Sequence, residues 1–283
     1  MDDPYDQYPE DTDRRRFVKG VVGAGALTGV VAPAASMIDS LTAPPGAGGG
    51  PTDYMGIEKT GGPAPRGMPQ IPLEYDDEGN LKGIWPEVEM QQVGGQTVPI
   101  AEMELGGKLY STTWYQYCGS QNNPAIEPDA DLDNTIRYTA NPAYDWQSNQ
   151  VEAGDPVRAE HFSDYDGWGN VIGESGIGKP AKVTWRSTEL EPRDRIPVQL
   201  IRSPLIEEAA KDDEWLEAST VDGFIAIHNQ CTHFCCVPGY KDPGQTDAMA
   251  YGAGDSIYCQ CHQSVYDPFT IIEQDFIALP RSD

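Results

Sequence analysis

Two short segments near the end of the chain hold cysteine and histidine at close spacing. Cys231 and His233 are separated by one residue, and Cys259 and His262 are separated by two. Thiolate ligands suit zinc or an iron–sulfur cluster, and imidazole suits zinc or iron. The spacing therefore predicts a metal centre with two sulfur and two nitrogen ligands, and it leaves two metals open.

Additional cysteines accompany both ligand pairs. The segments Cys231–Pro238 and Cys259–Pro268 also contain Cys236 and Cys261, for which a zinc site with four ligands has no use. The two segments resemble the halves of a Rieske [2Fe–2S] site, which has the patterns Cys-Thr-His-x-x-Cys and Cys-x-Cys-His-x-Ser. The resemblance is sharp over residues 223–268 and general elsewhere.

The resemblance implies a [2Fe–2S] cluster with one pair of residues on each iron. Cys231 and Cys259 would hold one iron, and His233 and His262 would hold the other. A purely structural zinc module is the alternative that shares these ligand types.

The resemblance also implies roles for four neighbours of the ligands. Cys236 and Cys261 match the disulfide that joins the two cluster loops in the family. Ser264 and Tyr266 match the hydroxyl groups that donate hydrogen bonds to the cluster and to a ligand sulfur. Such bonds stabilise the more negative, reduced state and raise the reduction potential.

The chain departs from the family pattern at several positions within the loops. Cys235 and Gln263 stand where glycine is usual, Gln260 stands where proline is common, and Phe234 replaces a leucine beside the exposed histidine. The stretch Lys241–Asp255 lengthens the gap between the segments and is interpreted as a surface insertion.

The resemblance implies an electron-transfer subunit of a cytochrome bc-type quinol-oxidising complex. His262 or His233 would accept a hydrogen bond from quinol, and Phe234 would line the docking surface. The expected partners are a cytochrome b-type membrane subunit, quinol, and a cytochrome or copper protein that accepts the electron. The chain would act as the redox subunit of that enzyme and not as an independent enzyme.

Other Rieske functions fit less well or stay open. The small subunit of an arsenite oxidase shares both cluster type and leader type, so it remains an alternative. An oxygenase also needs a mononuclear iron held by two histidines and a carboxylate. His161 and His228 are the remaining histidines, and they lack that grouping.

The composition is strongly acidic. The 283 residues include 45 Asp and Glu against 19 Lys and Arg, a formal net charge of −26. Nucleic-acid binding is disfavoured, because such proteins are basic. The acidic residues are dispersed along the chain, which is typical of halophilic proteins, where salt screens the mutual repulsion.

The first residues predict export and a membrane anchor. Arg14 and Arg15, followed by Phe17–Lys19, resemble a twin-arginine signal, and the uncharged stretch Gly20–Ile38 is long enough to span a bilayer. A cleaved leader with a site at Ala32–Ala34 is the alternative. We expect a single N-terminal span, with the head on the extracytoplasmic side of the cell membrane.

The domain organisation follows from composition. Residues 1–41 are assigned to the twin-arginine signal and anchor, 42–67 to a flexible linker rich in proline and glycine, and 68–283 to the head. The predicted class is all-β, a Rieske-type antiparallel sandwich or partial barrel with a small cluster-binding subdomain and an N-terminal membrane helix. The segment 119–179 has no assignable motif.

Short apolar runs separated by turn residues predict the elements of the head. Strands are expected at Thr97–Ala101, Lys108–Tyr117, Lys182–Arg186, Pro197–Arg202 and Gly223–Ile227, and helices at Leu205–Lys211 and Glu214–Ser219. Phe276–Pro280 is expected to be the last strand and a proline-bearing loop over the cluster.

Two cysteines remain after these assignments. Cys118 and Cys235 are expected either to be reduced and buried or to form a second disulfide. His228 is expected to pack beside the first segment, and His161 to be solvated.

Overall fold

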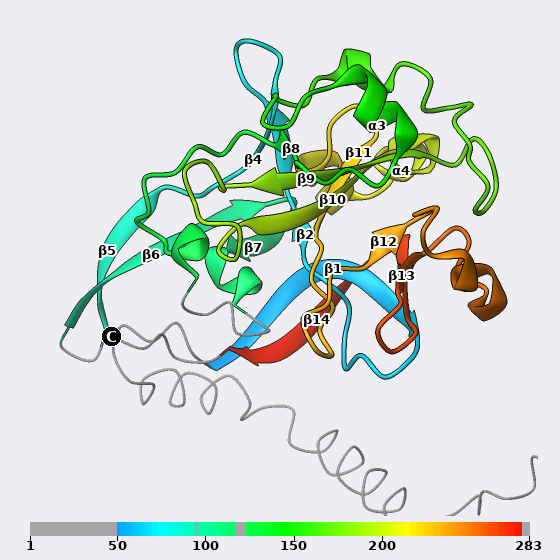
Figure 1. The fold of residues 1–283 in the computed structure, drawn as a ribbon. Coiled ribbons are helices and arrows are strands. Elements are labelled where there is room, and N and C mark those ends of the chain that lie inside the picture. Colours follow the sequence, from blue (N-terminus) through cyan, green and yellow to red (C-terminus); the bar gives the residue numbers. More distant parts are fainter. Residues whose placement is uncertain (1–49, 94–95, 117–122, 279–283) are drawn as a thin grey trace, which may run out of the picture. The chain divides into compact units, whose positions relative to one another are not determined.

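The computed structural model describes residues 50–93, 96–116 and 123–278 (Figure 1). Strands predominate over helices in these ranges, and the paired strands run antiparallel. The protein is therefore built mainly from antiparallel β-sheet, as the sequence predicts.

The strands of the described ranges form four sheets. The four-stranded sheet has the order β1 (Gly50–Gly61), β14 (Ser264–Ala278), β13 (Ile257–Cys259) and β12 (Gly239–Tyr240). The five-stranded sheet has the order β2 (Gln70–Ile71), β11 (Phe224–His228), β10 (Ile196–Arg202), β9 (Lys179–Trp185) and β8 (Arg137–Tyr138). The two smaller sheets consist of β3 (Leu73–Tyr75) with β4 (Leu81–Gly83), and of β5 (Val88–Val93), β6 (Gln96–Leu105) and β7 (Lys108–Ser111). The helices within the described residues are short: α3 (Asp145–Gln150), α4 (Pro204–Ala209), α5 (Glu214–Ser219), and the 3-10 helices η1 (Thr112–Tyr115), η3 (Pro124–Ile126), η4 (Ala159–Phe162) and η5 (Thr246–Tyr251).

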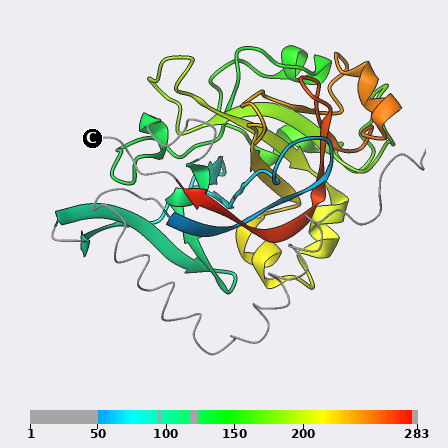
Figure 2. The same ribbon diagram turned by 90° about the horizontal axis from the view of Figure 1, so that it is seen from below.

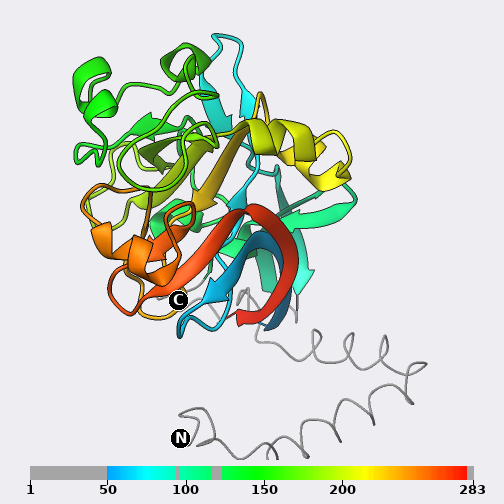
Figure 3. The same cartoon turned by 90° about the vertical axis from the view of Figure 1, so that its right-hand side faces the viewer.

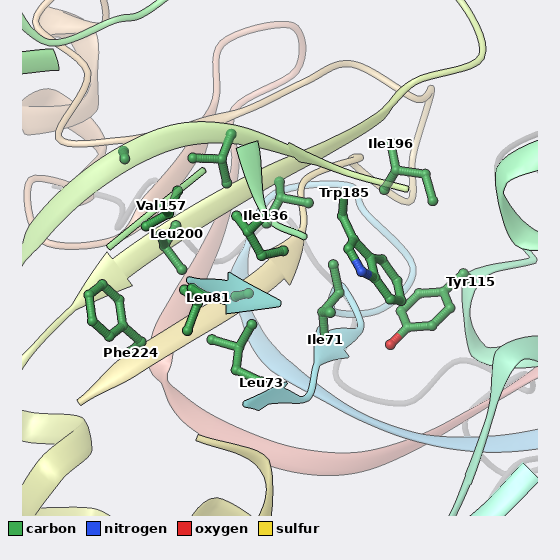
Figure 4. Packing of buried hydrophobic residues seen from close by; sticks show 14 of the residues in the cluster. Ile71, Leu73, Leu81, Tyr115, Ile136, Val157, Trp185, Ile196, Leu200 and Phe224 are labelled. Atoms are coloured by element: carbon green, nitrogen blue, oxygen red, sulfur yellow. The ribbon is translucent and has the colours of Figure 1, made fainter. Parts of the chain in front are cut away.

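The five-stranded sheet supports the main hydrophobic core. Apolar residues alternate along β9 and β10, so that Val183, Trp185 and Leu200 point to one buried face. Strand β11 lies between β2 and β10 and is buried along its whole length, which is typical of a strand covered on both faces. Figure 4 shows Trp185 and Leu200 packed with residues of the neighbouring segments.

Local sequence signals set the ends of several elements. The strand expected at Lys108–Tyr117 ends at Ser111, because the Ser111 hydroxyl accepts from Thr113 N and caps η1. Helix α5 has the predicted bounds, and its first turn is capped by the Asp213 carboxylate. The helix expected at Leu205–Lys211 begins at Pro204 behind the capping hydroxyl of Ser203 and ends at Ala209.

The stretch predicted as a flexible linker, residues 42–67, is corrected by the structure over its described part. Gly50–Gly61 form the long strand β1, which pairs with β14 along most of its length (Figures 2 and 3). Tyr54 and Ile57 are fully buried on this strand. The abundance of glycine and proline predicted a linker instead of a strand. The strand is stable because it pairs with a partner about 200 residues away and not because of local propensity.

The last strand expected at the C-terminal end is confirmed. Phe276 and Ala278 belong to β14 and pair with β1. Leu279 and Pro280 lie outside the described residues, as do the predicted signal and membrane segment in residues 1–41. None of the helices in the described ranges is long and apolar enough to cross a membrane.

Candidate metal centre

Two hairpin-like loops bring the cysteine and histidine segments together. The first segment follows β11 and leads into β12, and the second joins β13 to β14. Strands β12 and β13 pair with each other, with Gly239 opposite Tyr258, while Cys259 and Ser264 face each other across the second loop. The strand register therefore fixes both loops at one end of the four-stranded sheet.

The two loops adopt the same turn. Cys235 N donates to Cys231 O at 2.9 Å, and Gln263 N donates to Cys259 O at 2.9 Å. Cys235 and Gln263 both have left-handed backbones, with φ of 61° and 59°. These are the two positions at which the sequence lacks the expected glycine, so both loops keep a left-handed turn in spite of the side-chain strain.

Cys231 and Cys259 are the free thiols of the described residues, and both are buried. Their side chains are hydrogen-bonded to each other, and Cys231 Sγ lies 3.1 Å from the Tyr266 hydroxyl. Backbone N–H groups also point at each sulfur from its own loop, including those of the two candidate ligand histidines, His233 and His262. The two buried sulfurs thus lie together among hydrogen-bond donors.

These donors favour negative charge at one sulfur. The hydrogen bond from the Cys259 thiol lowers the pKa of Cys231 most, burial opposes the shift, and Tyr266 and backbone N–H groups add to it. The pKa of Cys259 is raised, first by its hydrogen bond to Cys231 and then by burial. The two sulfurs thus share one proton, and a bound metal would replace that proton and allow both to be thiolates.

The two imidazoles lie beside each other. The ring centroids of His233 and His262 are 4.7 Å apart, and the ring planes are nearly perpendicular. His262 is exposed, whereas His233 is half-buried, and its Nδ1 is buried without a hydrogen-bond partner in the described part of the chain. A buried ring nitrogen in this state is a suitable metal ligand.

Phe234 packs against both imidazoles. Its ring centroid lies 4.3 Å from that of His233 and 5.4 Å from that of His262. The Phe234 side chain is nevertheless 66% exposed. The exposed edge of the histidine pair is therefore bordered by an aromatic surface.

The spacing of the ligand atoms bears on whether the centre holds one metal ion or two. Zinc holds sulfur at about 2.3 Å and nitrogen at about 2.0 Å, so its ligand atoms lie within about 4.6 Å of one another. Among the described residues, the group with three such atoms within 4.8 Å consists of the Cys236, Cys259 and Cys261 sulfurs. Two of these sulfurs are bonded to each other. The free thiols and the imidazoles form no such group of three among the described residues, and two sulfur and two nitrogen donors are the ligand types of a histidine-ligated [2Fe–2S] group as well as of zinc.

The predicted disulfide is confirmed. Cys236 and Cys261 are bonded to each other and tie the first loop to the second. Cys235 is also disulfide-bonded. Cys118, the other cysteine for which a second disulfide is predicted, lies outside the described residues. The first loop is therefore linked covalently at two successive positions.

A segment that the sequence does not mark as functional covers the site. Residues 62–67 follow β1 and connect to both loops. Thr232 Oγ1 donates to Arg66 O at 2.6 Å, and Ala64 N donates to Ser264 Oγ at 3.2 Å. Gly62 has φ of 77°, and a Cβ there would lie 2.4 Å from Gln263 O. The Gly-Pro-Ala-Pro composition of this segment, which permits close backbone approach, is the signal that could have identified it.

The remaining predicted residues lie in the expected neighbourhood or away from the site. Ser264 is buried and accepts a hydrogen bond from the covering segment. His228 is buried on β11 against Tyr115. His161 is only half-buried, and its Nδ1 lies 3.0 Å from the Tyr138 hydroxyl. Lys241 is not at the surface as expected: its ammonium is buried and lies 3.0 Å from Asp255.

The structure thus brings four candidate ligands, a disulfide and two hydroxyl groups together in one place. Comparison with protein-family models, with curated proteins and with solved structures returned no match.

Proposed function

We propose that this protein is the Rieske-type iron–sulfur subunit of a membrane quinol oxidoreductase of the cytochrome bc type. One observation supports this most: two buried thiols and two adjacent imidazoles meet at two matching loops, and no three of these four described side chains hold their ligand atoms within 4.8 Å of one another. Cys231 and Cys259 would hold one iron of a [2Fe–2S] cluster, and His233 and His262 the other.

The sulfur side of the site is suited to holding negative charge. Tyr266 and backbone N–H groups donate to the thiols, and the surrounding apolar residues exclude water. Hydrogen bonds of this kind stabilise a reduced cluster relative to an oxidised one. The chain therefore controls the potential from the buried side of the centre.

The histidine side is suited to contact with a substrate. His262 presents an exposed imidazole, and Phe234 borders it with an apolar surface. We infer that His262 is the residue that accepts the hydrogen bond of a quinol hydroxyl and then takes its proton at a ring nitrogen. When bound, the cluster supplies the one-electron acceptor that this proton transfer accompanies. His233, which is half-buried, would serve mainly to position the pair.

The proposal includes the parts of the chain outside the described residues. Residues 1–41 would form the export signal and membrane anchor, and the β-rich part would be a Rieske-type sandwich with a small cluster-binding subdomain. The head would face the extracytoplasmic side, between a cytochrome b-type subunit and a cytochrome or copper-protein acceptor. The acidic, halophilic composition agrees with an exposed head in high salt.

The test is spectroscopic. We expect the purified protein to contain two irons and two sulfides per chain, to show a Rieske-type electron paramagnetic resonance signal, and to have a potential that falls as pH rises. Cys231→Ser should abolish the signal, whereas His228→Gln, which changes a buried histidine outside the ligand set, should keep it. A chain that holds one zinc ion and no iron would refute the proposal. Co-purification with cytochrome b would support quinol oxidation, and co-purification with a molybdenum subunit would overturn it.

A further inference from the structure

A ligand thiol lies against the disulfide. The sulfurs of Cys259, Cys236 and Cys261 all lie within 4.8 Å of one another, although Cys259 is free and the other two are bonded. A free thiol within 4.8 Å of both sulfurs of a disulfide is close enough for exchange after a small movement, in which a sulfur attacks one of two bonded sulfurs. The ligand role of Cys259 does not account for this contact.

We propose that Cys259, Cys236 and Cys261 form an intramolecular thiol–disulfide exchange site that operates when no metal group occupies the centre. The Cys259 sulfur attacks the Cys236 sulfur, a Cys236–Cys259 bond forms, and the Cys236–Cys261 bond breaks. The electron pair of the broken bond leaves with the Cys261 sulfur. The proton that Cys259 loses is matched by the proton that Cys261 takes up, so no external oxidant or reductant is consumed.

The burial of the three sulfurs sets the direction of attack. Cys259 is buried, Cys236 is half-buried and Cys261 is exposed. Release of Cys261 places the leaving sulfur in water, where its charge is solvated, and access and the leaving group both control such reactions. Attack on Cys261 would instead release Cys236 in a less exposed position. The product is therefore a chain with an exposed, reactive Cys261.

The geometry selects Cys259 over the other free thiol. Cys231 is not among the sulfurs gathered within 4.8 Å, although it accepts a hydrogen bond from Cys259. Of the two free thiols among the described residues, only Cys259 lies within 4.8 Å of both bonded sulfurs. Cys231 Sγ, which already accepts the hydrogen bond of the Cys259 thiol, takes that proton as Cys259 attacks. Exchange should therefore require Cys259, and loss of Cys231 should slow the exchange without abolishing it.

The exchange has a consequence for assembly, and this part rests on the proposed function. A chain with a Cys236–Cys259 bond has lost one of its two thiolate ligands, so it cannot take up a cluster until a thiol reverses the exchange. Ligation of Cys259 would in turn remove the attacking sulfur and keep the native disulfide. Loss of the metal would thus be followed by a change of disulfide pairing, from Cys236–Cys261 to Cys236–Cys259.

The experiment maps disulfides in the full-length protein with and without its metal. Iron is removed with a chelator under nitrogen, free thiols are trapped in acid with N-ethylmaleimide, and peptides are sequenced by mass spectrometry. Because Cys259 and Cys261 are separated by one residue, fragmentation between them must locate the label. We expect the Cys236–Cys259 bond, with label on Cys261, in the stripped chain and its complete absence from the loaded chain.

Two variants separate exchange from metal binding. Both Cys231→Ser and Cys259→Ser remove a proposed iron ligand, but only Cys259→Ser should abolish the rearranged bond. A stripped wild-type chain and a Cys231→Ser chain in which Cys236 is bonded to Cys261 and to no other cysteine would overturn the proposal, as would a new bond at Cys231. If the protein binds no iron at all, the rearranged bond should still be found in the purified chain, so failure of the proposed function is distinguishable.

Discussion

The hydroxyl of Tyr266 offers the sharpest test of the buried side of the centre. It lies 3.1 Å from Cys231 Sγ, and the tyrosine is fully buried in the small core that also contains Cys259. Tyr266→Phe removes this one hydrogen bond and leaves the ring that packs beneath the site. The expected result is a lower reduction potential with the cluster retained.

The size of the change follows from the charge on the acceptor. A hydrogen bond to a charged group contributes about 1.5–3 kcal/mol. The bond exists in both redox states, so only the part that strengthens on reduction alters the potential. If that part is about half, roughly 0.7–1.5 kcal/mol, the potential falls by about 30–65 mV, since 59 mV corresponds to a tenfold change for one electron.

Protein-film voltammetry would measure the difference against a matched control. Tyr240 is buried in the same core, and its hydroxyl has no hydrogen-bond partner in the described part of the chain. Tyr240→Phe makes the same chemical change without touching a sulfur and should leave the potential unaltered. Equal potentials in the two variants would show that the Tyr266 hydroxyl does not act on the ligand.

Three further predictions concern stability. Burial lowers the pKa of His228 to about 3, below the unfolded value of about 6.5, so acid favours the unfolded chain. Between about pH 8 and about pH 5, protonation of this histidine in the unfolded chain should lower the free energy of unfolding by about 2 kcal/mol. Urea titrations in which His228→Gln keeps the same dependence on pH as the wild type would contradict this. The Cys236–Cys261 bond spans 25 residues, so its replacement by two alanines should cost about 3.5 kcal/mol in thermal unfolding, and a negligible loss would be evidence against the constraint. Gly62→Ala should be less stable than Gly79→Ala and should lose iron faster to a chelator. Both glycines have positive φ, but of the two only residue 62 would place a Cβ against backbone atoms. Equal iron loss from the two variants would argue against close packing of residues 62–67 on the second loop.

Local patterns predicted the elements whose stability is local. Strand β10 and helix α5 were predictable, because alternation and a capping Asp213 are written within a few residues. The ligand candidates were predictable for the same reason, since each cysteine and its histidine occupy one short loop. The Cys236–Cys261 bond followed from the family resemblance and is present.

Features that depend on distant partners were not predictable. Strand β1 has the composition of a linker and is a strand only because β14 pairs with it. Residues 62–67 contact both loops of the site, although their composition predicts only a linker. Nothing in the local sequence relates Ala64 to Ser264, because their hydrogen bond joins residues 200 positions apart.

That separation in sequence determines how late in synthesis the site can form. Ribosomes add about 5–20 residues per second, so roughly 10–40 s pass between the emergence of Ala64 and that of Ser264. Until then the nascent polypeptide has an unpaired β1 edge and an open pocket, and a chaperone could shield both. On the proposed function, a cofactor delivered earlier would meet an incomplete set of ligands, so its insertion would have to follow translation.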